Sequence, residues 1–331
     1  MNTTQSRHWR RGDGLYHVAV EIQSKFQRIP VIDCDLHKVS QGDLRYNSVM
    51  LHISPLAPID YLVIGHLTND ITSQGNRMGG TAAYSSLTAR ALGLRVGVIT
   101  SCGEELSLEP LTGIPVVNYS SETSTTFENI YTPTGRIQYV RAFAASLDFY
   151  HIPEPWRSAA IVHLGPVAQE VEPSLVRNFT ASLIGVSPQG WLRDWDEQGR
   201  VFFGEWPESA FVLGRAGAAV ISSEDVGGNE DRIEEMASAC RLLAVTEAAH
   251  GTRLFWNGDV RRFRAPQVEE VDATGAGDIF AAAFFARLYA TRDPWESARF
   301  ATQVAAFSVT RTGLSGIPTP EEINACLVEV F

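Results

Sequence analysis

Short and almost continuous hydrophobic runs recur along the chain from residue 59 onward. Such runs are typical of strands that are buried on both faces of a parallel sheet. They lie at Tyr61–Gly65, Val96–Thr100, Ile161–Leu164, Leu183–Val186, Ala218–Ile221 and Leu242–Thr246. Helical stretches, the first at Gly80–Leu92, separate several of these runs. The pattern therefore predicts an α/β fold of three layers, with a Rossmann-like, mostly parallel central sheet and helices on both faces.

Two stretches instead have the pattern of β-hairpins. The first joins Thr125–Tyr131 to Arg136–Phe143, and the second spans Arg253–Phe263 and turns at Asn257–Gly258. We expect the first hairpin to pair with the short link between Gly65 and Gly79.

Residues 1–56 are polar and irregular. We therefore expect an N-terminal appendage over residues 1–56, to which no role is assigned, and one domain over residues 57–331. One hypothesis is that translation starts at Met50; N-terminal sequencing of the native protein tests it.

Composition narrows the class of protein. With 44% hydrophobic and 20% charged residues, the 331-residue chain is typical of a soluble globular protein. Its net charge of -11 argues against a nucleic-acid partner. No hydrophobic run approaches the roughly 18 residues that span a bilayer, so no membrane partner is expected. Cys34, Cys102, Cys240 and Cys326 form no C-x-x-C pair, which favours reduced thiols and a cytoplasmic location.

The stretch from Asp272 to Asp278, DATGAGD, gives the strongest indication of chemistry. Gly275 and Gly277 permit a tight turn, and the hydrophobic run Ile279–Ala286 predicts a helix directly after it. The first amides of a helix lack internal partners and attract anions, usually phosphate. Asp278 beside them can accept the proton of an attacking hydroxyl, as a phosphotransferase requires. A tight turn without any ligand is the alternative.

This stretch resembles the signature of the ribokinase-like (PfkB) family of carbohydrate and nucleoside kinases. The resemblance implies that Asp278 is the catalytic base and that the amides of Gly275, Ala276 and Gly277 hold the transferring phosphoryl group. It extends over nearly all the chain from residue 59 and implies the ribokinase-like fold. It also implies a small β-lid, near residues 66–78 and 122–146, that keeps water from the site; an ordinary edge hairpin is the alternative.

The acceptor side is expected at the start of the first helix. The resemblance implies that Asp70, Gly79 and Gly80 bind acceptor hydroxyls, and a carboxylate accepts such hydrogen bonds strongly. Tyr84 stands where many sugar kinases of the family have asparagine. This difference argues against a simple ribose or fructose pocket.

The phosphate and metal side departs from the family pattern. Ser222 and Asp225 replace the asparagine and glutamate of the N-x-x-E motif. The resemblance implies that Asp225 holds Mg²⁺ through water, that Ser223 contacts the nucleotide, and that Asp272 lies near a monovalent cation such as K⁺. A capped turn is the alternative for Ser222 and Asp225.

The nucleotide side departs as well. Thr246 and Gly251 are expected to line the nucleotide, although Ala248 replaces the first glycine of the family's T-x-G-x-x-G motif. A small-residue helix is expected at Ala301–Thr312, with Gln303 beside the adenine.

A finer resemblance concerns the acceptor. The segments Thr125–Glu128, Gln189–Arg193 and Ser222–Asp225 look like those of the myo-inositol kinase branch. Arg193 and Arg141 are candidates for contacts near the site, although an exposed arginine is usually only solvated.

The sequence thus predicts an ATP- and Mg²⁺-dependent kinase of a small sugar or cyclitol, with myo-inositol favoured. An exposed lid edge also allows a homodimer. The first alternative is an adenosine-type nucleoside kinase, whose acceptor base would stack on Tyr84, Phe127 or Tyr131. The second is a non-catalytic PfkB-like ligand-binding protein, which the altered motifs favour and the intact Asp278 disfavours.

Overall fold

The computed structural model describes residues 56–72, 75–132 and 135–327, and all structural statements below concern these residues. The predicted appendage over residues 1–56, except for Leu56, and the hypothesis of a start at Met50 lie outside them. The tips of the two predicted lid segments, at residues 73–74 and 133–134, also lie outside them.

A large central sheet organises the described part of the chain. Its strands run in the order β15-β14-β13-β12-β9-β8-β1-β4-β5. In chain order they are β1 (Tyr61–Ile64), β4 (Val96–Cys102), β5 (Val116–Ser120), β8 (Ile161–Leu164), β9 (Leu183–Val186), β12 (Ala218–Ser222), β13 (Leu242–Thr246), β14 (Thr252–Trp256) and β15 (Asp259–Phe263). Pairing is parallel from β5 to β13 and antiparallel in β14 and β15. The predicted α/β class, its buried strands and the second hairpin are confirmed.

The strand order changes direction beside β1. Leu62 of β1 lies between Gly97 of β4 and Val162 of β8 in the parallel register. The chain builds β4 and β5 on one side of β1 and then continues on the other side with β8. Ligands of open α/β sheets bind at such a switch point, beyond the carboxyl ends of the strands.

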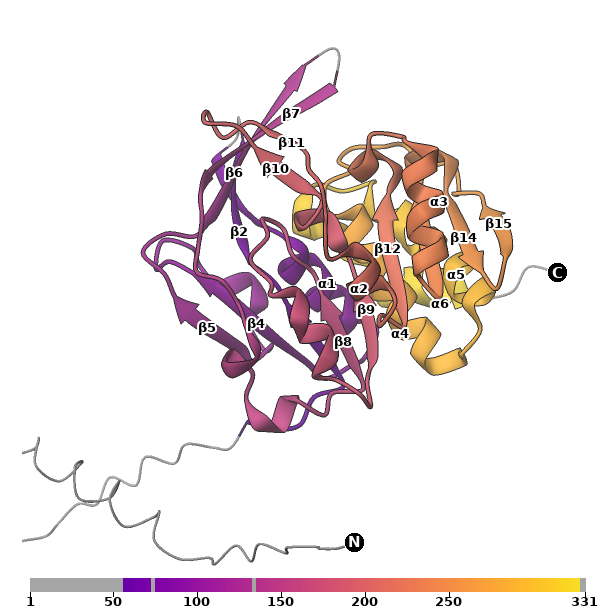
Figure 1. Ribbon diagram of the computed structural model, residues 1–331, viewed down its shortest axis with the longest axis horizontal. Coiled ribbons are helices and arrows are strands. Elements are labelled where there is room, and N and C mark those ends of the chain that lie inside the picture. The colour runs from indigo at the N-terminus through magenta and orange to yellow at the C-terminus, as the bar shows by residue number, and fades with distance from the viewer. Residues whose placement is uncertain (1–55, 73–74, 133–134, 328–331) are drawn as a thin grey trace, which may run out of the picture. The chain divides into compact units, whose positions relative to one another are not determined.

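Helices cover both faces of this sheet (Figure 1). One face carries α1 (Thr81–Ala91), α4 (Ala276–Thr291) and α5 (Pro294–Ser308), with α6 (Pro320–Leu327) against α5; the other carries α2 (Ser209–Leu213) and α3 (Glu230–Ala239). β1 contributes to the hydrophobic cores on both faces of the sheet. Tyr61 and Val63 point to the face covered by α1, α4 and α5, and Leu62 and Ile64 point to the face covered by α2 and α3. α4 packs between the sheet and its neighbouring helices, which explains why its hydrophobic residues are not confined to one stripe.

The helix predicted at Ala301–Thr312 is present, but its predicted bounds were wrong, because α5 begins at Pro294 and ends at Ser308. The helix begins at Pro294 because the Asp293 side chain accepts hydrogen bonds from the amides of Trp295 (2.9 Å) and Glu296 (3.2 Å). An aspartate cap followed by proline is a strong start signal. The prediction relied on the run of small residues and overlooked this cap.

A second, smaller sheet has the order β3-β2-β6-β7. Its strands are β2 (Thr68–Thr72), β3 (Gly75–Gly79), β6 (Thr125–Thr132) and β7 (Gly135–Ala142). β2 pairs with β6, so the predicted pairing of the first hairpin with the link after Gly65 is confirmed. A two-stranded ribbon, β10 (Arg193–Trp195) and β11 (Val201–Phe203), lies beside it, and the Val140 amide donates to the Gly199 carbonyl (2.8 Å) (Figure 1).

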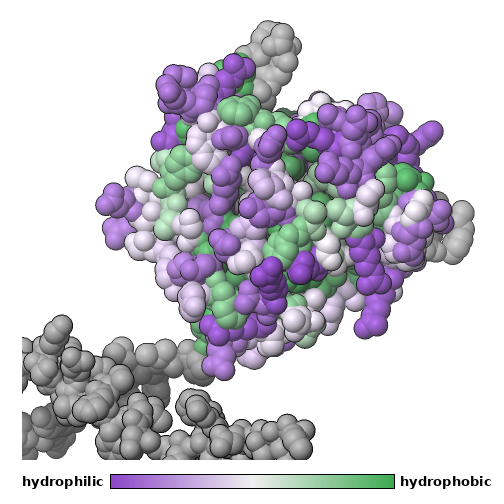
Figure 2. Space-filling model, in the orientation of Figure 1, coloured by the Kyte–Doolittle hydropathy of each residue, from purple (hydrophilic) through white to green (hydrophobic). Residues whose placement is uncertain are grey.

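Hydrophilic and hydrophobic residues are interspersed on the face shown in Figure 2. A large continuous hydrophobic area, which would indicate an extensive interface, does not appear on that face. None of the helices in the described residues combines the length and the apolar character that a bilayer span requires.

Candidate active site

The DATGAGD stretch forms a tight turn that leads into α4. Gly275 is the N-cap residue, with a left-handed φ of 80°, and the Ala276 amide donates to the Ala273 carbonyl (3.2 Å). The amides of Gly277 and Asp278 lie in the first turn of the helix, where no intrahelical carbonyl is available to them. The sequence analysis expected the amides of Gly275, Ala276 and Gly277 to be available to a phosphoryl group. The Ala276 amide differs from this expectation, because it already donates to an acceptor within the turn.

Asp278 is partly buried between α4 and the start of α1. Its carboxylate accepts a hydrogen bond from the Thr81 side chain, and Ser85 Oγ donates to its backbone carbonyl (3.1 Å). Burial raises the pKa of Asp278 to about 6, although the Thr81 hydrogen bond and the positive charge of Arg193 act in the opposite direction. A carboxyl group with this pKa suits a general base that works near neutral pH.

Two further carboxylates approach Asp278 from other elements. Asp70 lies on β2, and Asp225 lies in the turn that follows β12. Their negative charges add to the rise of the Asp278 pKa. The fold therefore brings together three of the predicted site residues that are far apart in the sequence.

Asp70 and the glycine pair lie around Thr68. Thr68 Oγ1 donates to Asp70 Oδ1 (2.9 Å), and Gly79 lies opposite Thr68 across the β2–β3 pair. A Cβ on Gly79 would overlap the Asp70 carboxylate, and a Cβ on Gly80 would overlap the His66 carbonyl. The three predicted acceptor residues thus form one compact group.

Asp225 has a capping role. Its Oδ2 accepts from the Ser222 amide (2.8 Å), while Ser222 Oγ accepts from the Glu224 amide (3.2 Å). This is the capped turn considered as an alternative, and Ser223 lies within it. Asp225 Oδ1 accepts from Gln189 Nε2 (2.9 Å), which links the turn to the segment that carries Arg193. The capping role and a position near Asp278 coexist.

Arg193 lies closer to the site than the sequence indicated. Its Nη1 donates to the Val167 carbonyl (2.9 Å), and its guanidinium lies over the Phe127 ring, 5.2 Å from the centroid. Its charge lowers the pKa of Asp278. The sequence signal was the Gln189–Arg193 segment, but only the tertiary structure brings the charge of this arginine near Asp278.

Arg141 lies elsewhere, at the junction of the small sheet with the ribbon. It pairs with Glu128 (2.6 Å) and donates to the Gln198 carbonyl (3.1 Å). Arg141 therefore joins β6 and β7 to the turn of the ribbon.

The segment from Thr246 to Gly251 makes a tight turn between β13 and β14. Thr246 is in register with Ser222 at the ends of β13 and β12. Ala248 has a φ of 48°, in the left-handed region that favours glycine. The structure thus explains the family's glycine at this position, while alanine occupies the same conformation under strain.

Asp272 ties the DATGAGD turn to the segment after α5. Its Oδ1 accepts from the Thr274 amide and its Oδ2 from the Gly313 amide, both at 2.9 Å. Its own amide donates to the Val309 carbonyl (3.0 Å). These contacts give Asp272 a structural role.

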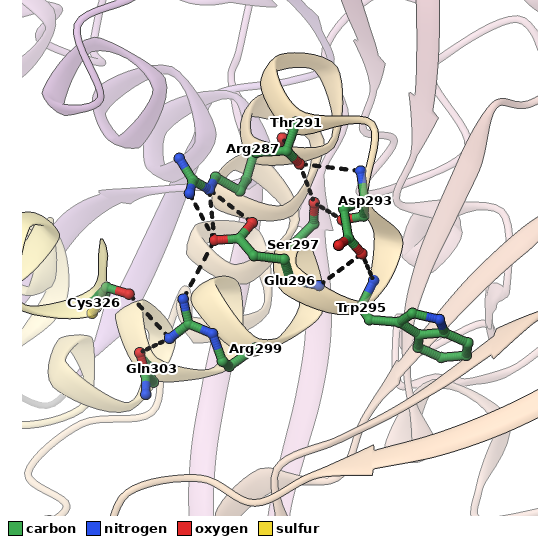
Figure 3. Close-up of polar contacts among 9 residues, drawn as sticks. All are labelled: Arg287, Thr291, Asp293, Trp295, Glu296, Ser297, Arg299, Gln303 and Cys326. Atoms are coloured by element: carbon green, nitrogen blue, oxygen red, sulfur yellow. Dashed lines mark hydrogen bonds and ion pairs between the residues drawn. The ribbon is translucent and has the colours of Figure 1, made fainter. Parts of the chain in front are cut away.

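Gln303 belongs to a polar network between α4, α5 and α6 (Figure 3). Its Oε1 accepts from Arg299 (3.0 Å), which also donates to the Cys326 carbonyl (3.1 Å) and to Glu296 (3.3 Å). Arg287 completes the network with a 2.7 Å ion pair to Glu296. Gln303 thus takes part in contacts that join α5 to α6.

A buried polar chain below the site was not predicted. His163 accepts or donates through both ring nitrogens, to Tyr61 Oη (3.1 Å) and Ser187 Oγ (2.9 Å). Burial lowers the pKa of His163 to about 3, so the ring is neutral. No pattern in the sequence distinguishes this histidine, because its two partners, Tyr61 and Ser187, are distant from it in the sequence.

A preformed metal centre is not evident in the described part. None of its residues form a group of three or more His, Cys, Asp or Glu side chains that could hold a metal ion. Magnesium in phosphoryl transfer is usually held by one or two carboxylates together with waters and phosphate oxygens.

Comparison with known proteins shows similarity to carbohydrate and nucleoside kinases. Residues 197–321 match the model of the pfkB family carbohydrate kinases. The cytidine kinase of Thermococcus kodakarensis is 26% identical over 247 residues, which cover 69% of this chain and 88% of that enzyme. The inositol 3-kinase of Zea mays is 26% identical over 288 residues, covering 77% of this chain and 73% of that enzyme.

Solved structures share the fold. A pyrophosphate-dependent kinase in the ribokinase family, complexed with a pyrophosphate analog and myo-inositol, has a TM-score of 0.66 at 21% identity and covers 80% of this chain and 99% of that one. Arabidopsis thaliana ribokinase, complexed with ribose and ATP, has a TM-score of 0.64 at 17% identity, with 83% and 100% covered. The sheet order and the helices on both faces agree with the ribokinase-like fold of these structures, and residues 197–321 match the PfkB carbohydrate kinase family.

Proposed function

We propose that the chain transfers the terminal phosphoryl group of ATP to a hydroxyl of a small cyclitol or sugar, with myo-inositol favoured. The observation that carries this proposal is the position of Asp278 in the first turn of α4, with a pKa of about 6. A base next to unpartnered helix amides suits the attack of an alcohol on a phosphoryl group.

In the proposed reaction the acceptor hydroxyl gives its proton to the Asp278 carboxylate as its oxygen attacks the terminal phosphorus. The bond from that phosphorus to the bridging oxygen breaks, and ADP leaves. The amides of the Gly275–Gly277 turn stabilise the negative charge of the phosphoryl group. Rearrangement of the Ala276 amide away from the Ala273 carbonyl would complete that group of donors.

The acceptor is proposed to bind between Asp70 and Arg193. Asp70, Gly79 and Gly80 form a compact group with hydrogen-bond acceptors for hydroxyls, and Arg193 offers donors on the same side as Asp278. The hydroxyls around the ring of a polyol can donate hydrogen bonds to Asp70 and accept hydrogen bonds from Arg193. This arrangement supports a cyclitol or sugar, as bound by relatives such as the inositol 3-kinase.

Binding sites for the metal ions and the nucleotide belong to the same proposal. We propose that Asp225 holds Mg²⁺ through water, since its carboxylate oxygens are suitable ligands, and that Mg²⁺ neutralises phosphate charge. A monovalent cation such as K⁺ is proposed near Asp272. Nucleotide contacts are proposed for the residues at the ends of β12 and β13 and on α5: Ser223, Thr246, Gly251 and Gln303.

We further propose that the small sheet acts as a lid over the acceptor, and that residues 57–331 form the kinase domain, preceded by an appendage. The small sheet carries Asp70, so its movement would carry an acceptor contact with it. Its outer strand β3 is a sheet edge that a second copy could pair with, which supports a homodimer.

Nucleoside phosphorylation is the second candidate, because a cytidine kinase is among the relatives. Tyr84 and Phe127, which could stack a base, are both buried, and Arg193 lies against Phe127. The side chain of Tyr131 lies outside the described residues. This burial favours the cyclitol over the nucleoside.

The test is ³¹P NMR of the products formed from Mg-ATP with myo-inositol, fructose, ribose, cytidine and adenosine. Pyrophosphate is included as a second donor, because one structural neighbour is a pyrophosphate-dependent kinase. A phosphomonoester of myo-inositol or a sugar supports the proposal. A phosphorylated nucleoside alone would replace it by the second candidate.

A further inference from the structure

Glu170 is a buried carboxylate that organises the loop after β8. Only 5% of its surface is exposed. Its Oε2 accepts from the Ala168 amide (2.7 Å), and both of its oxygens accept from the Val167 amide (3.1 and 3.0 Å). Buried carboxylates are costly unless they are well hydrogen-bonded, so these amides are fixed around the charge.

The same residue holds two of the connections to the small sheet. Glu170 Oε1 accepts from the amide of His66, which leads into β2 (2.9 Å). Its backbone carbonyl accepts from the amide of Leu147, which follows β7 (2.8 Å). Glu170 therefore contacts the segment that leads into β2 and the segment that follows β7.

His66 also contacts the segments at both ends of the β6–β7 hairpin. Its Nδ1 lies 2.7 Å from Thr125 Oγ1, at the start of β6, and its Nε2 lies 2.8 Å from the Ala145 carbonyl, after β7. The carbonyl requires Nε2 to be the donor. Thr125 Oγ1 also accepts from the Ala144 amide (3.0 Å). The buried His66 ring thus links the start of β6 to the segment after β7 through hydrogen bonds.

The loop fixed by Glu170 also holds Arg193. The Val167 carbonyl accepts from Arg193 Nη1 (2.9 Å), and Gln169 Nε2 donates to the Arg193 carbonyl (2.6 Å). Gln169 has a left-handed φ of 62°, so this loop is held in a conformation that few side chains adopt. Both the side chain and the main chain of Arg193 therefore depend on the loop around Glu170.

We propose that Glu170 is a positioning residue that sets the small sheet and Arg193 in one fixed relation to Asp278. It is not a catalytic residue, since it acts through His66 and through the loop that holds Arg193. Removal of its charge should release the Val167 and His66 amides together, so that Arg193 and the roots of the small sheet shift as a unit. This inference rests on the proposed function for its effect on turnover, but the coupling itself is a property of the fold.

The kinetic test is a double-mutant cycle with Glu170→Gln and Arg193→Ala in the full-length chain. Glu170→Gln should lower kcat/KM about 10- to 100-fold, because small misplacements of positioning groups have effects of this size. In the Arg193→Ala background, Glu170→Gln should lower kcat/KM by a clearly smaller factor than in the wild type, since the part of its effect that passes through Arg193 is already lost. Fully additive losses would overturn the proposal.

Control and rescue variants separate positioning from general damage. Glu172→Gln removes an exposed carboxylate two residues away and should leave kcat/KM unchanged. Glu170→Asp keeps the charge and should retain more activity than Glu170→Gln. If Glu170→Gln does not fold, the cycle is run with Glu170→Asp, which has the same predicted non-additivity.

Hydrogen exchange followed by mass spectrometry tests the coupling without any turnover. In Glu170→Gln, amide exchange should rise about tenfold in β6, β7 and the ribbon β10–β11 together, relative to the wild type and to Glu172→Gln. A rise confined to residues 165–172 would overturn the coupling. If the wild type has no kinase activity, the proposed function fails, and this experiment still decides the inference.

Discussion

The ring of Tyr84, on α1, packs directly against the backbone of Gly275, the N-cap residue of α4. Any Cβ at position 275 would overlap that ring. Tyr84 is buried, and its burial, followed by the nearby charges of Asp70 and Asp278, raises its pKa above the usual range. The tyrosine that replaces the asparagine of many sugar kinases therefore packs against the DATGAGD turn.

Gly275→Ala should destabilise the protein by about 2–4 kcal/mol, from overlap with the Tyr84 ring and from the left-handed φ of 80°. The control is Gly277→Ala, where a Cβ meets no atom within 4 Å and the helix position favours alanine. Urea denaturation should show a stability loss in the first variant and none in the second. Equal stability of the two variants would contradict the packing described here.

Asp278→Asn should increase stability above about pH 6 and abolish turnover. The folded-state pKa is raised from 3.8 to about 6, so the charged form is disfavoured by burial at higher pH, by about 3 kcal/mol at most. The wild type regains that stability as pH falls from about 6 to 3.8, because the folded state then binds the proton more tightly. Urea denaturation at about pH 8 and pH 4.5 measures the change; a stability gain that is the same at both values would contradict the assigned shift.

The same pKa predicts the pH dependence of the reaction. A base must be unprotonated to accept a proton, so kcat/KM should fall tenfold per pH unit below about pH 6. A pH–rate profile with saturating Mg-ATP measures this limb. An acid limb centred near pH 4 would show that Asp278 is not shifted or is not the base.

His163 should make the fold sensitive to acid. Its pKa is lowered from 6.5 to about 3 by burial, so below pH 6.5 the unfolded chain binds a proton that the folded chain does not. Stability should therefore fall by about 1.4 kcal/mol per pH unit from this group, progressively from pH 6.5 to pH 3. His163→Gln cannot bind the proton, so the difference between its stability curve and that of the wild type isolates the slope. Parallel curves would refute the prediction.

Ala248→Gly should change stability by less than about 1 kcal/mol. The relief of the left-handed conformation at φ 48° is offset by the greater freedom of glycine in the unfolded chain. A change in the KM for ATP would then report on the turn that is proposed to line the nucleotide. Thermal denaturation together with the KM for ATP measures both effects, and a large loss of stability would contradict the strain assigned to Ala248.

Local patterns in the sequence were enough for the strands and for the glycine-rich turn. The run Tyr61–Gly65 is buried on both faces, and DATGAGD carries its own turn and helix start, so both could be recognised from local sequence. The start of α5 was predicted wrongly because the cap at Asp293 lies outside the small-residue run that was used to place the helix.

Contacts between distant segments could not be predicted in this way. The position of Arg193 beside Asp278 depends on the loop around Glu170, and the attachment of Gln303 depends on Arg299 and the end of α6. Nothing local marks such partners, because each hydrogen bond joins elements that only the folded sheet brings together.

The central claim is that Asp278 activates an acceptor hydroxyl for phosphoryl transfer. The most direct test is acceptor-dependent ADP release from Mg-ATP, measured for the wild type and for Asp278→Asn with myo-inositol as the first acceptor. The account predicts release that depends on the acceptor and falls by at least about 100-fold in Asp278→Asn, with ATP binding retained. Near-normal release in Asp278→Asn would contradict it.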